Sequence, residues 1–221
     1  KGWVEFGTVG SGVNKFNEIN QVATDKQGRI YITDSANYRM VRIDDMSGKG
    51  WIEYHVQGAF GMDLDSKDRI YLIEQGYNRI ARIDNAEGGG RVVFGEIGKG
   101  VKQFSGIKYL EIDSQDRIYI GDKCNYRIIR FDDMTGTNWI AFQSNGTLKE
   151  LDAHCGDTDL SLSGSGVGQF RHEVGGIAID LQGRIYVADE HNDRVIRMDD
   201  MTGKGWVEFK GVGDDKLHLP H

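Results

Sequence analysis

Four segments of this chain are copies of one another, and each begins with Arg-Ile-Tyr preceded by Gly or Asp. The copies begin at Gly28, Asp68, Asp116 and Gly183, so the spacings between them are 40, 48 and 67 residues. Each copy contains short runs of alternating apolar and polar residues, separated by turns rich in Gly and Asp. A period near 40 residues built in this way is typical of β-propeller blades. We therefore predict an all-β fold, a β-propeller of four-stranded antiparallel blades.

The length and charge of the chain limit its organisation and its partners. With 221 residues the chain can bury one sizeable core, so we expect a single domain over residues 1–221. The net charge is −7 without a block of basic residues, which argues against nucleic acid as a partner. No apolar run approaches the roughly 20 residues of a membrane span, so none is predicted. Cys124 and Cys155 permit one disulfide without deciding the compartment, and a secreted or periplasmic location is favoured.

Each repeat contains four candidate strands of four to six residues. The innermost strand ends at an aspartate, which is Asp25, Asp65, Asp113 or Asp180. The second strand begins at Ile-Tyr, the third begins at an arginine, and the outer strand begins at Trp51, Arg91, Trp139 or Trp206. One additional outer strand is predicted at Trp3–Phe6, where the sequence matches that of Trp51–Tyr54. The recurring tryptophans are best explained by packing at the rim of each blade.

The turn between the second and third strands carries the pattern Asp-x-x-Asn-x-Arg, and Gly-x-Gly-x-x-x-Phe precedes the innermost strand. The first pattern occurs three times, as Asp34/Asn37/Arg39, Asp122/Asn125/Arg127 and Asp189/Asn192/Arg194. In these motifs the chain resembles the NHL-repeat family of β-propellers, over nearly its whole length except roughly residues 143–165. The second repeat departs from the pattern, with Glu74, Tyr77 and Arg79. The resemblance implies a binding scaffold more often than an enzyme.

Residues that recur in every blade are better explained by architecture than by catalysis. The Asp34–Arg39 type of pair is predicted to be an ion pair that locks a turn, worth ~1 kcal/mol if partly exposed. Paired aspartates follow the third strand at Asp44/Asp45, Asp132/Asp133 and Asp199/Asp200. These pairs lack the alternating spacing of a calcium loop, and we interpret them as turns that hydrogen-bond their own backbone.

Departures from the repeat are more informative about function. Two residues before the aspartate of the innermost strand, the four copies carry Ala23, Asp63, Glu111 and Ala178. Asp63 and Glu111 therefore place carboxyl groups near the axis on adjacent blades, where unpaired burial would cost several kcal/mol. The alternatives are an Arg or Tyr partner from the next blade, exposure to a wet channel, a bound cation such as Ca²⁺ or Mg²⁺, and a general base.

The second departure is an insertion at about 143–170, between the third and fourth blades. The topology of a four-stranded blade gathers five residues at this boundary on one face: Cys124, His154, Cys155, His172 and His191. Three or four converging His and Cys side chains could hold a soft metal such as Zn²⁺. The alternatives are a disulfide between Cys124 and Cys155, or unconnected surface residues.

The two ends of the chain do not close a ring. We count five outer strands and four sets of inner strands, which favours either part of a longer propeller or completion by a second copy. Apolar residues of the end blades should then be exposed, namely Val22, Ile30 and Ile32 in the first blade and Ile177, Ile185 and Val187 in the fourth.

Two functions agree with these observations. The first is a non-catalytic scaffold that binds a protein partner or self-associates. The second is a lyase or lactone hydrolase of propeller type that depends on a divalent cation near the axis. No Gly-x-Ser-x-Gly motif is present, and no set of residues builds a nucleophile with its base, so binding is favoured.

Overall fold

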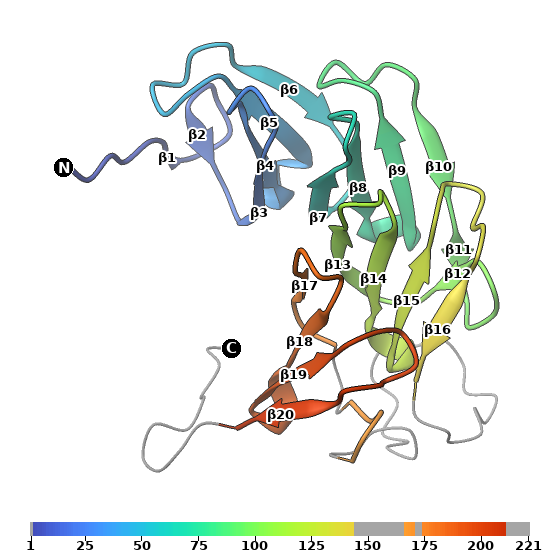
Figure 1. The fold of residues 1–221 in the computed structure, drawn as a ribbon. Coiled ribbons are helices and arrows are strands. Elements are labelled where there is room, and N and C mark those ends of the chain that lie inside the picture. The colour runs from blue at the N-terminus through green and yellow to red at the C-terminus, as the bar shows by residue number, and fades with distance from the viewer. Residues whose placement is uncertain (1, 144–165, 171–173, 211–221) are drawn as a thin grey trace.

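The computed structural model describes residues 2–143, 166–170 and 174–210, and over these residues the chain is nearly all β. It forms four four-stranded antiparallel sheets, in each of which the strands follow one another in sequence order (Figure 1). The first blade comprises β3 (Ile19–Thr24), β4 (Ile30–Asp34), β5 (Arg39–Ile43) and β6 (Ile52–His55), and the second β7 (Ala59–Leu64), β8 (Ile70–Glu74), β9 (Arg79–Ile83) and β10 (Val92–Phe94). The third comprises β13 (Ile107–Ile112), β14 (Ile118–Asp122), β15 (Arg127–Phe131) and β16 (Ile140–Phe142), and the fourth β17 (Ile177–Ile179), β18 (Ile185–Asp189), β19 (Arg194–Met198) and β20 (Val207–Phe209). The predicted propeller of four-stranded blades is confirmed.

The blades are arranged as an open arc with their first strands at its inner edge. Figure 1 shows β3, β7, β13 and β17 along this edge, and the outer strands β6, β10, β16 and β20 at the periphery. The first strands of neighbouring blades pack against one another, β3 on β7 and β7 on β13. The residues of these first strands are therefore the ones nearest the axis.

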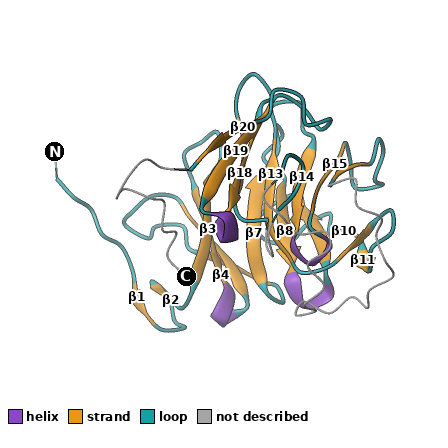
Figure 2. Ribbon diagram, turned by 90° about the horizontal axis from the view of Figure 1, so that it is seen from below, coloured by secondary structure: helices purple, strands orange, loops and turns teal. Residues whose placement is uncertain are grey.

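Short elements connect the strands. A single turn of 3₁₀ helix joins the second and third strands of each blade: η1 (Ser35–Asn37), η2 (Gln75–Tyr77), η3 (Lys123–Asn125) and η4 (Glu190–Asn192) (Figure 2). The glycine-rich stretch before the first and third blades forms a loop closed by a two-residue parallel ladder. The paired strands are β1 (Thr8–Val9) with β2 (Lys15–Phe16), and β11 (Glu96–Ile97) with β12 (Gln103–Phe104). We call residues 7–16 and 95–104 the glycine loops.

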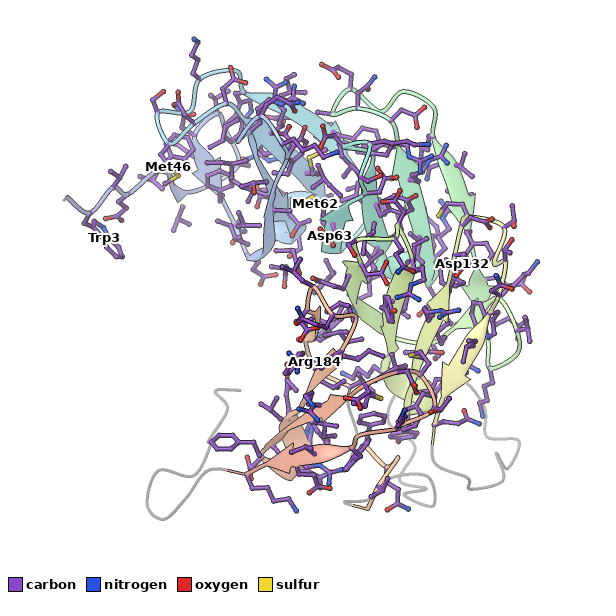
Figure 3. The ribbon with its side chains drawn as sticks, in the orientation of Figure 1. Trp3, Met46, Met62, Asp63, Asp132 and Arg184 are labelled. Carbon is purple, nitrogen blue, oxygen red and sulfur yellow. The ribbon has the colours of Figure 1, made fainter. Side chains whose placement is uncertain are left out.

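The additional outer strand predicted at Trp3–Phe6 is absent from the structure. Residues 2–7 form no strand, and Trp3 is 90% exposed instead of packing at a blade rim (Figure 3). An outer strand pairs with the third strand of its own blade, and within the described residues Trp3–Phe6 pair with no third strand. Phe6 nevertheless packs against Phe16, with ring centroids 6.0 Å apart.

The hydrophobic core lies between blades, and each blade contributes two faces to it. We call the face toward the next blade in chain order the trailing face, and the face toward the preceding blade the leading face. At the junction of the second and third blades, Tyr71 and Ile80 of the trailing face pack with Ile118 and Ile120 of the leading face. The equivalent tyrosines Tyr31 and Tyr119 occupy the other two junctions.

The predicted exposure of the end blades is only partly correct. In the first blade Val22 is 55% exposed as predicted, but Ile32 is buried with Phe16 and Ile30 is only half-exposed. In the fourth blade Ile177, Ile185 and Val187 are all buried, contrary to the prediction. These three residues alternate onto the leading face and pack against Tyr119 of the third blade. The trailing face of the fourth blade carries Tyr186, which is half-exposed.

The alternation of Gly and Asp at the start of each repeat has a conformational cause. Gly28, Asp68, Asp116 and Gly183 close the turn between the first and second strands, and their φ angles are 80°, 58°, 62° and 77°. Glycine adopts this left-handed conformation freely, and Asp is among the residues that tolerate it. No helix in the described ranges is both long enough and apolar enough to cross a membrane.

Candidate functional site at the blade axis

The recurring Asp and Arg residues form buried ion pairs, as the architectural interpretation predicts. Arg39 Nε donates to Asp34 Oδ2 at 2.8 Å, and both side chains are almost completely buried. Asn37 donates to the same carboxylate oxygen at 2.8 Å. The third and fourth blades repeat these contacts with Asp122/Asn125/Arg127 and Asp189/Asn192/Arg194.

The sequence did not indicate what these arginines hold in place. Arg39 also donates to the backbone carbonyls of Ser11 and Lys15, so the guanidinium clamps the glycine loop of its own blade. Arg127 does the same to Lys99 and Gln103 in the third blade. The Asp-x-x-Asn-x-Arg pattern and the Gly-x-Gly-x-x-x-Phe pattern are therefore two halves of one interaction.

This interaction explains why the second repeat departs from the pattern. Only three residues, 56–58, separate β6 from β7, so the second blade has no glycine loop to clamp. Glu74 instead accepts one hydrogen bond from Arg79 and another from Arg91, each at 2.6 Å. In this repeat the asparagine stands one position later, at Asn78, which adopts a left-handed φ of 47°. Its side-chain oxygen accepts the N–H of Gly106 in the third blade.

The aspartate that ends each inner strand is also structural. Asp25 accepts Arg29 Nε at 2.5 Å and the Tyr31 hydroxyl at 3.0 Å, and burial together with this hydroxyl contact raises the pKa of Tyr31 to about 12. The pattern Asp-x-x-x-Arg-x-Tyr occurs in all four repeats, and its fourfold recurrence could have predicted this contact. The other members are Asp65/Arg69/Tyr71, Asp113/Arg117/Tyr119 and Asp180/Arg184/Tyr186.

The paired aspartates lie in turns and accept hydrogen bonds from the backbone of those turns, as predicted. Asp133 accepts the N–H and the hydroxyl of Thr135, and the hydroxyl bond is the main cause that lowers the pKa of Asp133 to about 2. Asp45 and Asp200 make the same contacts with Ser47 and Thr202. These carboxylates lie at the periphery of the blades, where Figure 3 labels Asp132.

The axial pair, Asp63 and Glu111, remains after these assignments. Asp63 lies on β7 at the inner edge of the arc (Figure 3), and Glu111 lies on the neighbouring inner strand β13. Asp63 Oδ2 accepts the N–H of Ile112 at 2.7 Å, and Oδ1 accepts the N–H of Leu64 at 2.8 Å. The Asp63 carboxylate therefore bridges two blades through backbone donors.

Both axial carboxyl groups have raised pKa values. Burial raises the pKa of Asp63, and the two backbone N–H donors oppose part of this rise. Burial, with a smaller contribution from the nearby charge of Asp63, raises the pKa of Glu111 to about 8. Glu111 is therefore protonated at neutral pH, and it loses this proton only when a positive charge approaches or the pH rises.

The predicted Arg or Tyr partner for the axial pair is not found in the described part of the chain. Neither Asp63 nor Glu111 forms an ion pair there, although many other acidic groups do. In the same residues no group of three or more His, Cys, Asp and Glu side chains converges as a metal site would require. The axial pair thus offers two carboxyl oxygen ligand groups, where a divalent cation such as Ca²⁺ takes six to eight oxygen atoms.

A shallow hollow of about 340 Å³ lies beside this site, at the turns that follow the inner strands. Its lining includes Leu64 and Ile112, the sequence neighbours of the axial pair, together with Lys26, Ser66 and Asp116. Asp116 accepts the N–H and the hydroxyl of Ser66, each at 2.7 Å, and so ties the second blade to the third. Two of the side chains that line the hollow are therefore already hydrogen-bonded to one another.

The predicted cluster of Cys and His residues is only partly visible. Cys124 on η3 is disulfide-bonded, which removes its thiolate from any metal site and agrees with the disulfide alternative. His191 lies on η4, and it is an exposed residue. His154, Cys155 and His172, with most of the insertion, lie outside the described residues.

The four blades, joined through inner strands and paired faces, define a β-propeller. No protein-family model matches the chain, and no curated protein matches its sequence. Solved structures do match in fold. A catalytically inactive virginiamycin B lyase from Staphylococcus aureus, solved with quinupristin, aligns with a TM-score of 0.60 and 16% identity over 93% of this chain and 58% of its own.

Two further structures support the same fold. A streptogramin B lyase aligns with a TM-score of 0.61 and 15% identity, over 94% of this chain and 58% of its own. A Bacteroides caccae protein of unknown function aligns with a TM-score of 0.59 and 11% identity, over 87% of this chain and 68% of its own. The chain thus spans less than two thirds of the length of the lyases it matches. At these identities the matches establish the propeller fold alone.

Proposed function

We propose that this protein is a non-catalytic β-propeller scaffold, and that its axial pair receives a basic side chain of a protein partner. One observation carries the proposal: Asp63 and Glu111 lie side by side in sequence register on adjacent inner strands, without an ion pair in the described structure. By contrast, the buried carboxylates that recur from blade to blade in that structure each pair with an arginine of their own blade. We infer further that the repeats are of the NHL kind and that residues 1–221 form one domain interrupted by the insertion.

The chemistry of the pair favours a guanidinium or ammonium group over a metal ion. Two carboxyl groups match the donor fork of an arginine or the charge of a lysine, and both cations need fewer ligands than Ca²⁺, Mg²⁺ or Zn²⁺. A cation at the axis would also restore the ionised form of Glu111. The acidic character of the site argues against phosphate groups, and therefore against nucleic acid.

Calorimetric titration of the protein with a hexa-arginine peptide tests this proposal. The peptide should bind, and its affinity should fall at least tenfold in Asp63→Asn and in Glu111→Gln. Glu87→Gln is the control for net charge, because Glu87 is an exposed acid on the second blade and its loss removes a negative charge without touching the axial pair. Equal affinity of all four proteins would mean that the peptide responds only to the net charge of −7.

A lyase or lactone hydrolase is the second candidate, and the pKa of Glu111 favours it. A carboxyl group with a pKa near 8 can act as a general acid at neutral pH. The structural neighbours that are lyases agree with this candidate in fold. Incubation with quinupristin, with and without Mg²⁺, and chromatography of the products would test it. Turnover that disappears in Glu111→Gln would replace the scaffold proposal.

A further inference from the structure

The arginine that begins the third strand holds a peptide segment in place in three of the four blades. In the first, third and fourth blades this arginine is almost completely buried. Its Nη2 atom donates to the backbone carbonyl of the residue before the phenylalanine that precedes the innermost strand: Lys15, Gln103 and Gln169. The position beside this arginine is therefore suited to the oxygen atoms of a peptide.

Arg79 stands at the same position in the second blade, which has no glycine loop. Its Nε atom donates to Glu74, and its side chain is 29% exposed. In the described part of the chain, neither Nη1 nor Nη2 of Arg79 donates a hydrogen bond to another residue. The donors that hold a peptide segment in the other three blades are therefore available to a ligand in the second.

A second arginine adjoins Arg79. Arg91 stands where the other three blades carry the tryptophan that begins the outer strand, and it donates to Glu74 Oε1 at 2.6 Å. Arg79 donates to the other oxygen of the same carboxylate, also at 2.6 Å, so the two guanidinium groups lie close together. The half-exposed ring of Tyr77 lies against Arg79, with 4.3 Å between the ring centroid and the guanidinium carbon.

The charge of this position differs from that of its equivalents. In the first and fourth blades the arginine also pairs with a glutamate of the outer strand, Glu53 or Glu208, so acidic groups outnumber the arginine. In the second blade the same register position is Val93, and two arginines share the single carboxylate of Glu74. The second blade therefore carries a positive charge that its own residues leave unbalanced, which favours an anionic ligand over a neutral one.

We propose that Arg79 and Arg91 bind a carboxylate carried by a peptide segment of a partner. The carboxylate accepts hydrogen bonds from the Nη atoms of Arg79, whose planar fork matches its two oxygen atoms, and Arg91 supplies the second positive charge. The backbone of the segment occupies the place that a glycine loop holds in the other blades, which favours a peptide over a free anion. Arg79 and Asp63 lie toward opposite ends of the strands, so the proposal goes beyond the proposed function and does not depend on it.

An NMR titration with three probes tests this proposal and separates the possible sources of the carboxylate. The probes are the capped peptide acetyl-Gly-Glu-Gly-Val-amide, the same peptide with glutamine in place of glutamate, and sodium acetate. We expect the glutamate peptide to shift the Nε–H resonance of Arg79. We also expect it to bind at least tenfold more tightly than the glutamine peptide, because of its charge, and at least tenfold more tightly than acetate, because of its backbone.

Variants of the protein show whether the arginines themselves are responsible. Arg91→Gln should weaken binding of the glutamate peptide at least tenfold, and so should Arg79→Lys, which keeps the charge but loses the fork. Arg184→Gln is the matched control, because Arg91 and Arg184 each pair with one carboxylate and their side chains are 37% and 38% exposed. It should change the affinity less than twofold, and the amide spectrum of each variant checks its fold. Absence of binding, equal binding of the two peptides, equal binding of acetate, or an equal loss of affinity in Arg184→Gln would each overturn the proposal.

Discussion

The Asp63 carboxylate on β7 accepts the backbone N–H of Ile112 on β13 at 2.7 Å, which joins two blades at the inner edge of the arc. This bond holds the carboxylate beside Glu111, the residue that precedes Ile112. Two acidic groups lie on adjacent inner strands, and the Asp63 carboxylate is held by backbone donors and not by arginine, which distinguishes this position from the recurring ones. The arrangement and the architecture around it have consequences that can be measured.

Replacing Glu111 by Gln should stabilise the protein at alkaline pH. The pKa of Glu111 is about 8 in the folded chain, against 4.5 for an isolated glutamate, so the folded state holds the proton more tightly. Stability contributed by this proton is complete below pH 4.5, declines between pH 4.5 and 8, and is absent above pH 8. The difference between variant and parent should therefore be small at pH 4.5 and grow to several kcal/mol at about pH 8.5, since one unit of pKa shift corresponds to ~1.4 kcal/mol. Thermal unfolding at the two pH values measures this difference, and an equal effect at both would contradict the raised pKa.

Removing the clamp arginine should destabilise a blade more where the buried carboxylate has no second arginine as a partner. Arg127→Met leaves Asp122 buried without a cation and frees the glycine loop, so we expect a loss of about 3–5 kcal/mol. Arg79→Met is the matched comparison, because Glu74 keeps its hydrogen bond to Arg91 and the loss should be about 1–2 kcal/mol. Urea unfolding of both variants gives the comparison. Similar losses of unfolding free energy in the two variants would mean that the hydrogen bonds from Arg127 to the glycine loop do not stabilise the blade.

The close approach of the second and third blades predicts intolerance of a single methyl group. A Cβ atom on Gly61 would lie 2.5 Å from the carbonyl oxygen of Lys108, and backbone atoms of β13 cannot move aside independently. Gly61→Ala should therefore cost about 2–4 kcal/mol by forcing the inner strands apart. Gly76→Ala, where no atom lies within 4 Å, should change the free energy of unfolding by less than about 0.5 kcal/mol. A mild effect of Gly61→Ala would indicate that the blades pack less tightly than described.

The repeat sequence predicted the blades because each strand and turn is specified locally. The Ile-Tyr run of the second strand, the left-handed position at Gly28 and the hydrogen-bonding turn at Asp45 all depend on residues a few positions apart. Contacts between elements were harder to predict. The clamp from Arg39 to Ser11 spans 28 residues, and nothing in either motif names the other as its partner.

The sequence also predicted the axial pair, but it did not predict the contacts that hold the pair in place. Asp63 and Glu111 were identified as departures from the repeat, which requires only an alignment of the copies. The hydrogen bonds that compensate the burial of Asp63 were not predicted, because the donors are the backbone N–H groups of Leu64 and Ile112 and carry no sequence pattern. The exposure of the end blades was misassigned in the fourth blade, where alternate residues of β18 face opposite junctions. Ile185 and Val187 face the third blade, whereas Tyr186 faces away from it.

The most direct test of the axial pair is a carbon-detected NMR titration of the Glu111 carboxyl group, with and without the hexa-arginine peptide. Without the peptide the carboxyl should titrate with a pKa of about 8, and in Asp63→Asn this pKa should fall because a neighbouring negative charge is removed. With the peptide bound the pKa should fall by at least about one pH unit, since the cation stabilises the ionised form. Two results would contradict the role of Asp63 and Glu111 as the receptor for a basic side chain. One is a pKa of Glu111 near 4.5 in the absence of the peptide, and the other is a pKa near 8 that does not change when the peptide binds.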